Sequence, residues 1–274
     1  MKWNKGQINA FRRKIFDWWK DHRRDLPWRW TNDPYTIFVS EVMLQQTQVS
    51  RVLPKYKEFL DQFPNIFSLA KASPAAVLRV WKGMGYNRRA LYLQQTAKRI
   101  VLDYHGIFPQ EEKKLMELPG LGKYTARAIL VFAFKKNVAM IDTNIRQIIT
   151  HFFFHDVFQK ESIIQETADL LIPNGKSWEW HQALMDYGAL AMSNIKYSIS
   201  NKKNNTIPFR HSSRFYRGKI IDQLREHAFR EDDLIDDFRK RYGKSKSELN
   251  HIIIQLKKEH LIEKKTHTLS LPDS

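Results

Sequence analysis

The sequence contains no cysteine among its 274 residues. Disulfide bonds, thiolate zinc sites and cysteine-ligated iron–sulfur clusters are therefore excluded for this chain. The sequence also lacks an apolar run of about 18 residues, so we expect no transmembrane helix and no membrane partner. Its basic N-terminal stretch lacks the apolar core and the small-residue cleavage site of a secretory signal peptide. These absences favour a cytoplasmic, nucleoid-associated protein.

Acidic residues are in the minority. The chain has 29 Asp and Glu against 46 Lys and Arg, which gives a formal net charge of +17. Residues 213–274 hold 14 basic and 11 acidic side chains, so a charge of +14 lies in residues 1–212. Such an excess indicates a polyanionic partner. The alternative is a generally basic protein without one.

Alternating strand patterns are missing from residues 1–195, where apolar spacings of three and four dominate. This spacing predicts an all-α region with short loops. We expect helices at 8–22, 35–49, 51–62, 66–71, 74–82, 88–105, 111–117, 123–134, 143–154, 161–171 and 178–193. Asp33-Pro34, Ser73-Pro74 and Asp142 are N-capping signals within this series.

The pattern changes after a polar stretch at 198–212, which predicts a linker. Helices are expected at 213–228, 231–242 and 245–259, followed by LIEKKTHTLSL, whose alternation predicts a two-stranded hairpin. Three helices and a hairpin are typical of a winged helix and also occur in other small α+β domains. We therefore expect an all-α core followed by a small winged-helix-like α+β domain at 213–274.

Glycine is sparse, but two glycines lie close together in LPGLGKYTA at 118–126. A nucleotide-binding Walker loop is excluded because Tyr124 stands where Ser or Thr must follow the lysine, and the third glycine of a Rossmann loop is missing. A helix–hairpin–helix fits better. Gly120 and Gly122 permit positive φ and close approach, and the amides that open the next helix can bind a DNA phosphate. A tight turn without a ligand is the alternative.

Two carboxylates are candidates for chemistry. Glu41 is surrounded by apolar residues on its helix, and burial would raise its pKa into the range of a general acid. A surface glutamate is the alternative. Asp142 follows an apolar stretch and opens a helix, so one of its oxygens can cap that helix while the other faces a ligand. A third stretch, KGMGYNRRA at 82–90, has the glycines, aromatic residue and adjacent arginines of a loop that wedges into a duplex.

The motifs LPWR, DPY, SEVMLQQTQV, GMGY, LPGLGKYTA and IDTNIR occur in this order. Together they closely resemble the helix–hairpin–helix DNA glycosylase superfamily, and within it the MutY-type adenine glycosylases, over roughly residues 8–195. The resemblance implies a monomeric base-excision-repair enzyme that removes a flipped, mismatched adenine opposite guanine or 8-oxoguanine in double-stranded DNA. A thymine/uracil–guanine mismatch glycosylase and a non-catalytic DNA-binding protein remain alternatives.

The resemblance also implies catalytic roles. Glu41 corresponds to the general acid that protonates adenine at N7. Asp142 corresponds to the carboxylate that stabilises the developing sugar cation or forms a transient covalent adduct, and Asn144 supports it. Tyr124 stands where bifunctional relatives place a Schiff-base lysine, so we expect a monofunctional enzyme.

DNA-binding roles follow in the same way. Arg29 corresponds to an arginine near the flipped base, and Gln46 and Tyr86 to residues that intercalate at the lesion. The paired glutamines Gln45-Gln46 favour the adenine enzymes over the thymine/uracil enzymes. Further expected DNA contacts lie in the arginine pair and in the hairpin, which often holds a monovalent cation: Arg88, Leu118, Gly120, Gly122 and Lys123.

The chain departs from the family in two regions. Four cysteines of most members correspond to Met192, Ile199, Lys202 and Pro208, so no iron–sulfur cluster and no other cofactor is expected. The 62 residues after 212 are too few for the usual Nudix-like domain, which leaves the opposing base open. The family's two helical domains, with a cleft between them, would span 1–28 with 136–197 and 29–135, and 198–212 would replace the cluster loop.

Overall fold

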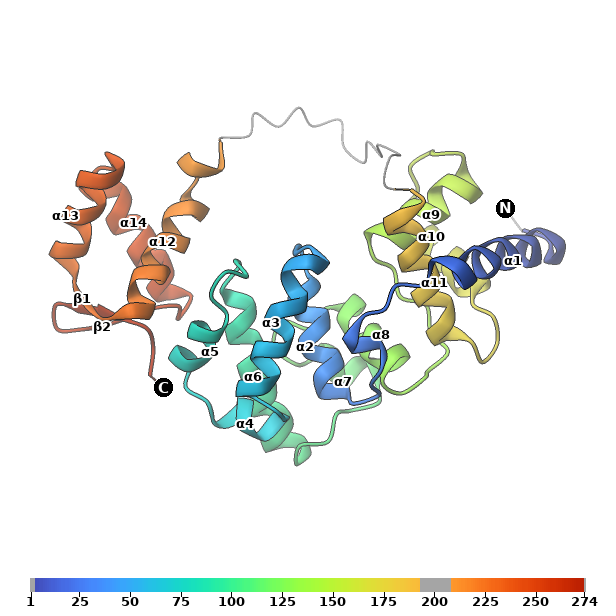
Figure 1. The fold of residues 1–274 in the computed structure, drawn as a ribbon, viewed down its shortest axis with the longest axis horizontal. Helices are drawn as coiled ribbons and strands as arrows, with labels where there is room; N and C mark the ends of the chain where they lie inside the picture. The colour runs from blue at the N-terminus through green and yellow to red at the C-terminus, as the bar shows by residue number, and fades with distance from the viewer. Residues whose placement is uncertain (1–2, 193–207, 274) are drawn as a thin grey trace. The chain divides into compact units, whose positions relative to one another are not determined.

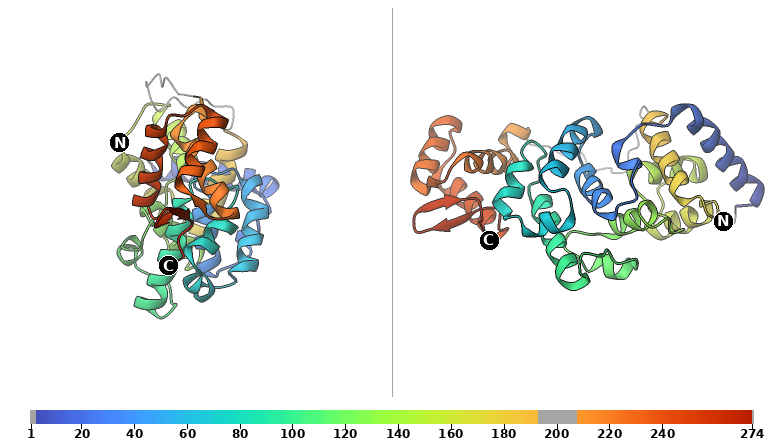
Figure 2. Two further views of the ribbon diagram at one scale, coloured as in Figure 1. Left: turned by 90° about the vertical axis from the view of Figure 1, so that its left-hand side faces the viewer. Right: turned by 60° about the horizontal axis from the view of Figure 1, so that its bottom comes forward.

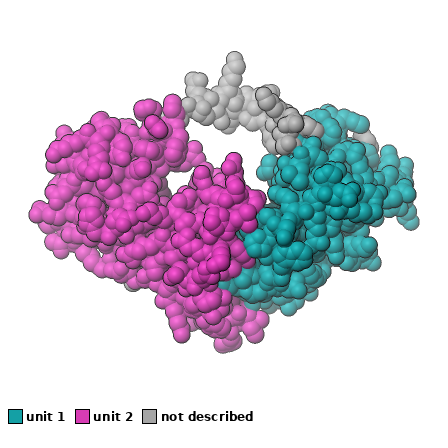
Figure 3. Space-filling view, in the orientation of Figure 1, with its two compact units in different colours: residues 1–41, 108–203 teal, residues 42–107, 204–274 magenta. Residues whose placement is uncertain are grey.

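The computed structural model describes residues 3–192 and 208–273, which are helical over most of their length (Figures 1 and 2). Contacts divide the chain into two compact units, residues 1–41 with 108–203 and residues 42–107 with 204–274 (Figure 3). Each unit therefore combines two separate parts of the chain. The limits of these units differ from the domain boundaries expected from the sequence, 1–28 with 136–197 and 29–135. Those expected boundaries stay a prediction.

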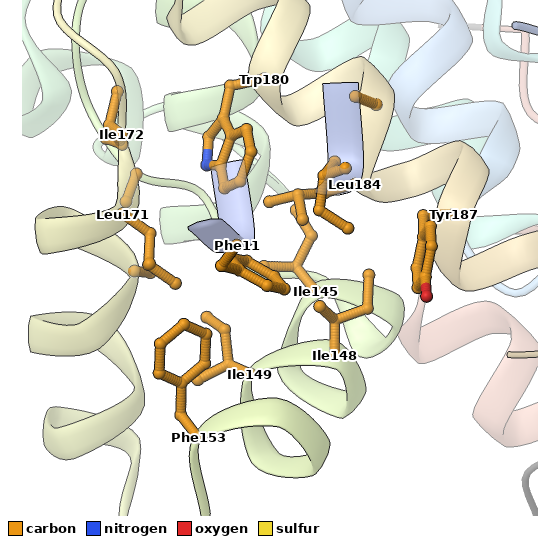
Figure 4. Close-up of a cluster of buried hydrophobic side chains, with 14 of the residues drawn as sticks. Phe11, Ile145, Ile148, Ile149, Phe153, Leu171, Ile172, Trp180, Leu184 and Tyr187 are labelled. Carbon is orange, nitrogen blue, oxygen red and sulfur yellow. The ribbon is translucent and has the colours of Figure 1, made fainter. Parts of the chain in front are cut away.

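The first unit is a helical assembly. It contains α1 (Lys5–His22), η1 (Pro27–Arg29), most of α2 (Pro34–Leu44), α7 (Glu112–Met116), α8 (Lys123–Phe132), α9 (Thr143–Phe154), α10 (Glu161–Leu171) and α11 (Ser177–Leu190). Its main core gathers apolar side chains of α1, α9 and α11, among them Phe11, Ile145 and Trp180 (Figure 4). This core fixes the start of α9 against α11.

Several helices begin where the sequence places a capping residue. Asp33 accepts hydrogen bonds from the amides that open α2, Ser73 from Ala76 before α5 (Pro74–Val80), and Asp142 from Ile145. A side-chain oxygen in this position satisfies an amide that lacks a partner within the helix. All three capping predictions are confirmed.

The second unit joins a helical part to the C-terminal part. The helical part holds α3 (Val49–Gln62), α4 (Ile66–Lys71), α5 and α6 (Arg88–Tyr104). The C-terminal part holds η2 (Phe209–His211), α12 (Ser213–Glu226), β1 (Phe229–Arg230), α13 (Glu231–Tyr242), α14 (Lys246–Lys258), β2 (Glu263–Lys265) and β3 (Thr268–Ser270). Three helices followed by a β2–β3 hairpin confirm the winged-helix-like prediction.

The C-terminal sheet has one strand that the sequence did not predict. It is antiparallel with the order β1-β3-β2, and the two-residue strand β1 pairs with β3 through Phe229 opposite Leu269. A strand this short shows no alternation, so only its pairing reveals it.

Many expected boundaries differ from the structure by one to three residues, and two differ more. The helix predicted at 35–49 ends at Leu44, and Gln46 adopts a positive φ of 55°. In the linker predicted at 198–212, residues 198–207 lie outside the described residues, whereas 209–211 form η2 and Ser212 precedes α12. Within the described part of the chain, no helix has the combined length and apolar character needed to cross a membrane.

Candidate active site

Two carboxylates and a tyrosine from different parts of the first unit come together. Glu41 lies in the last turn of α2, Tyr124 in the first turn of α8, and Asp142 directly before α9. The Tyr124 hydroxyl donates a hydrogen bond to the Glu41 carboxylate, and the charge of Asp142 acts on the same group. The fold therefore unites three residues that span about one hundred positions of the chain.

The environment of Glu41 is that of a general acid. Its side chain is only 5% exposed. Burial raises the pKa of Glu41 to about 7; the Tyr124 hydrogen bond opposes this rise, and the Asp142 charge adds to it. Burial, followed by the charges of both carboxylates, raises the pKa of Tyr124 well above its usual value, so its hydroxyl keeps its proton. Glu41 can therefore hold a transferable proton near neutral pH.

Asp142 is held in a fixed orientation. Its Oδ1 accepts from the amide of Ile145 at 2.7 Å, and its Oδ2 accepts from Nδ2 of Asn144 at 3.1 Å. Burial raises the pKa of Asp142, while these hydrogen bonds oppose the rise. Both oxygens thus have a defined direction, which suits a carboxylate that must face one reacting atom.

Close packing of α11 positions Asn144. Gly188 lies on α11, and a Cβ added there would be 2.6 Å from Cβ of Asn144 and 3.3 Å from its Cα. These atoms belong to or adjoin the main chain and cannot move aside easily. The missing side chain of Gly188 therefore allows the first turn of α9, and with it Asp142, to lie where it does.

A neutral histidine fixes the segment before Asp142. The Nε2 atom of His181 accepts a hydrogen bond from the amide of Met140 at 3.1 Å, so its proton lies on Nδ1, which donates to the carbonyl of Ser177 at 2.7 Å. Burial lowers the pKa of His181 to about 4, and the bond to Ser177 opposes this shift. His181 thus stays neutral near pH 7 and holds this segment in place through its two hydrogen bonds, without acting as an acid in the reaction.

The predicted hairpin forms between α7 and α8. Leu118 is buried and accepts from the amide of Leu121, Gly120 has a φ of 73°, and a Cβ on Gly122 would meet no atom within 4 Å among the described residues. No described side chain caps α8, and Lys123 is exposed beside its first turn. The start of α8 is thus open toward solvent, as an anion-binding helix terminus must be.

Arg29 has a structural partner. It is 5% exposed, and its two terminal nitrogens donate to the two oxygens of Asp186 at 2.8 Å each. Asp186 also accepts from Trp19 at 2.9 Å and from Arg24. Burial would raise the pKa of Asp186, but the hydrogen bonds from Arg29 and Arg24 lower it below its usual value. Arg29 belongs to this buried network, so its contact with a flipped base stays a prediction.

The residues expected to intercalate lie in the second unit. Gln46 and Tyr86 are exposed and adopt positive φ values of 55° and 44°. Such values are unfavourable for residues with a side chain, and they are found at helix ends, at turns and at functional sites. Arg88 is also exposed, and its guanidinium lies 5.1 Å from the ring centroid of Tyr92.

Arg89 holds the two strained segments together. It is buried, and burial lowers its pKa to about 10. Its guanidinium donates to Thr47 and to the carbonyls of Val42, Met43, Gln45 and Met84 at 2.5–3.2 Å. These bonds cap the end of α2 and fix the segments that carry Gln46 and Tyr86 relative to each other.

Comparison with known proteins places this arrangement in a family. Residues 39–174 match the model of the HhH-GPD superfamily of base excision DNA repair proteins. An adenine DNA glycosylase of Mycolicibacterium smegmatis is 34% identical over 78% of this chain and 80% of its own length. The chain belongs to the HhH-GPD superfamily.

Two further similar proteins are named for the removal of different bases, adenine and thymine. An adenine DNA glycosylase of Buchnera aphidicola is 34% identical over 78% of this chain, which spans only 61% of the length of that protein. The solved structure of a thermostable thymine-DNA glycosylase is 31% identical, with a TM-score of 0.66 over 70% of this chain and 90% of that one. The family is therefore clear, and it includes both adenine and thymine glycosylases.

The HhH-GPD match includes Glu41, Tyr124 and Asp142. The sequence predicted these three residues as catalytic, and the fold brings them together. Sequence reasoning missed Asp186 and His181. Asp186 stands in an apolar helix, the same signal that pointed to Glu41, and could have been found by it. Within the described parts of the chain, no group of three or more His, Asp and Glu side chains is arranged to hold a metal ion.

Proposed function

We propose that this protein is a monofunctional DNA glycosylase that hydrolyses the N-glycosidic bond of a mismatched adenine in double-stranded DNA, opposite guanine or 8-oxoguanine. The observation that carries the proposal is the buried Glu41, whose pKa is raised to about 7 beside Tyr124 and Asp142. Cleavage of an N-glycosidic bond needs a proton for the leaving base and negative charge near the sugar. Two carboxylates in different environments can divide these tasks.

The reaction follows from this division. Glu41 donates its proton to N7 of the extruded adenine, and the electron pair of the C1′–N9 bond passes to the base. The Asp142 carboxylate stabilises the cationic sugar or bonds to C1′ transiently. Water then adds to C1′ and loses a proton, which leaves free adenine and an abasic site. Positioning by Asn144 and Gly188 keeps Asp142 aligned with C1′ during this step.

Strand cleavage is not part of the proposed activity. A lyase needs an amine that attacks C1′ and forms a Schiff base. By resemblance, Tyr124 stands where bifunctional relatives place that amine, and its proton is held by burial, by the charges of Glu41 and Asp142 and by the bond to Glu41. Lys123 is adjacent in sequence but is exposed, so it does not share the partly buried environment of Tyr124.

The proposed DNA contact at the hairpin is a phosphate bound at the start of α8. Residues 118–122 carry no carboxylate, so their oxygen donors are main-chain carbonyls. Neutral carbonyl oxygens suit a monovalent cation, which would be held by the turn at Leu118 and Gly120 and would add positive charge beside the phosphate. We further propose a monomeric enzyme at the nucleoid, without an iron–sulfur cluster because the chain has no cysteine.

The test is a substrate panel under single-turnover conditions. Duplexes with adenine opposite 8-oxoguanine, adenine opposite guanine, thymine opposite guanine and uracil opposite guanine are incubated with excess enzyme. Alkali then converts each abasic site into a strand break. We expect breaks only at adenine and only after alkali, and no release by Asp142→Asn, which should still bind the duplex. Release of thymine or uracil without adenine would refute the proposal.

A thymine/uracil–guanine mismatch glycosylase is the second candidate, because the solved thymine-DNA glycosylase shares this fold. Two observations favour adenine. Gln45-Gln46 lie in the segment proposed to intercalate, and this pair favours the adenine enzymes by resemblance. A buried protonated acid suits a purine, whose N7 can accept a proton. Pyrimidines lack that nitrogen. The same panel separates the two candidates, since each predicts release from different duplexes.

A further inference from the structure

A groove of about 950 Å³ lies within the second unit, between its helical part and its C-terminal part. One wall is the segment from Met84 to Tyr92 with Gln45 and Gln46, and the other is α12. Figure 1 shows α12 (orange) near α5, and the two helices are in contact. The volume is at the upper end of the range for pockets that bind small molecules or nucleotides.

The C-terminal wall is anchored firmly. The buried Arg225 of α12 donates to the carbonyl of Leu78 and to Oδ1 of Asn87, both at 2.8 Å. Lys82 pairs with Glu226 at 2.8 Å. Because several bonds of different kinds join the two parts, the groove has a defined width and is not a gap between freely moving domains.

The charge of the groove suits an anion. Its acidic lining residues, Asp222 and Glu259, are already paired with Arg225 and Arg217. Arg89 is bound by carbonyls, and four further lining cations have no carboxylate partner among the residues that the structure describes: Arg51, Arg88, Arg214 and Lys219. A lining with spare positive charge attracts phosphate.

Aromatic rings lie among these cations. Arg214 of α12 donates to the hydroxyl of Tyr86 at 2.8 Å, which links the strained wedge residue to the C-terminal wall. Phe215 lies one residue further along α12 in the same groove, with the ammonium group of Lys219 at 5.8 Å from its ring centroid. Aromatic faces next to cations are the combination with which proteins hold bases and phosphates of unpaired nucleic-acid strands.

A glycine on α12 leaves room for a ligand in the groove. Gly218 lines the groove in the middle of the helix, where glycine is less favourable than alanine. A Cβ built on Gly218 meets no atom within 4 Å in the described part of the chain. Packing within the protein therefore does not explain why a side chain is missing here. A molecule that occupies the groove would explain it.

We propose that this groove binds an unstacked nucleotide of the DNA duplex, with its base against Tyr86 and Phe215 and its phosphate against Arg214 and Lys219. The C-terminal part thus contributes to DNA binding beside the wedge. The inference rests on the proposed function only in that DNA is the partner. It is independent of which base is excised.

The decisive experiment fills the groove without changing its charge. Gly218→Leu adds a good helix former at a position where a Cβ meets no described atom within 4 Å, so folding should be preserved. Ser247→Leu places the same side chain on an exposed position of α14 as a matched control. In the full-length protein carrying Asp142→Asn, to prevent turnover, we expect Gly218→Leu to raise the Kd for a mismatched duplex about tenfold. Ser247→Leu should leave this Kd unchanged. An unchanged Kd for Gly218→Leu, with an unchanged Tm, would overturn the inference.

A second pair of variants tests the phosphate contact. Lys219→Glu should weaken binding and lower the slope of log Kd against log salt by about 0.9. Lys240→Glu on α13 makes the same charge change outside the groove and should have a much smaller effect. Equal effects of the two variants would show that only the overall charge matters, which contradicts a built site.

Photocrosslinking identifies the occupant. With 5-iodouracil placed at successive positions of either strand, one position should crosslink to the peptide containing Phe215, and Gly218→Leu should abolish that crosslink. Free deoxynucleoside monophosphates in excess should not compete. Absence of any crosslink to this peptide, or full competition by free nucleotides, would refute binding of a DNA strand. If wild type binds DNA through the groove but releases no adenine, the proposed function fails and the groove stands.

Discussion

Replacing Glu41 by glutamine is expected to slow base release strongly and, from about pH 5 upward, to stabilise the protein. Burial raises the pKa of Glu41 from an ordinary 4.5 to about 7. Between these values the unfolded chain has lost a proton that the folded protein keeps, so the free energy of unfolding falls as the pH rises. Glutamine has the shape of the protonated acid, can still accept from Tyr124, and does not titrate. The variant should therefore lack this pH-dependent loss of stability.

The size of the effect follows from the two pKa values. One unit of pKa difference corresponds to about 1.4 kcal/mol. For values of 4.5 and about 7, the free energy of unfolding of Glu41→Gln should exceed that of wild type by about 1 kcal/mol at pH 5 and by about 3 kcal/mol at pH 8. Loss of the general acid should slow base release by roughly 10²–10⁴.

Calorimetric Tm values from pH 5 to pH 8 test this prediction, with single-turnover assays on the same preparations. Glu166→Gln on α10 provides the matched control, because Glu166 is an exposed glutamate. Its Tm difference from wild type should stay small and constant across the pH range. If the Tm difference of Glu41→Gln were equally constant, Glu41 would not be held protonated in the folded protein, and the reasoning for a general acid would be refuted.

Three further substitutions test the surroundings of the site. Tyr124→Phe removes the hydrogen bond that lowers the pKa of Glu41, so the alkaline limb of the pH–rate profile should move up by about one unit; a downward shift would contradict the assigned donor. Gly188→Ala forces a methyl group toward Asn144, so single-turnover release should slow by about 10- to 100-fold with unchanged Kd, and an unchanged rate would exclude a positioning role. Asp186→Asn leaves buried arginine charge without its counter-ion and should lower the urea-derived free energy of unfolding by about 3–5 kcal/mol; a loss under about 1 kcal/mol would contradict a buried ion network.

The helices could be predicted from the sequence because their signals are local. Apolar spacing and capping residues act within a few positions, and α9 begins after Asp142 as its pattern predicted. The end of α2 could not be predicted this way, since Gln45 and Gln46 are good helix formers. The helix ends there with its carbonyls bound by Arg89, which lies more than 40 residues away.

The candidate site likewise contains residues that the sequence identified and residues whose role only the fold reveals. Residue type and apolar context identified Glu41, and position before a helix identified Asp142. The role of Arg29 could not be read from its neighbours, because its partner Asp186 lies 157 residues further along the chain. Long-range pairs leave no periodic signal. A buried acid and a buried arginine in one sequence are compatible with many pairings, and only the fold selects one.

Gly188 and Gly218 both lie inside helices, but the space around them differs. Gly188 is explained by packing within the protein, whereas we attribute Gly218 to the proposed DNA partner. Glycine at such a position costs about 0.5–1 kcal/mol relative to alanine, so each needs a reason. At Gly188 the reason is internal, since Cβ and Cα of Asn144 fill the space of a side chain. At Gly218 the described protein leaves that space open. Substitution of Gly188 should therefore change the rate of base release, whereas substitution of Gly218 should change the affinity for DNA, and the opposite pattern would reverse both assignments.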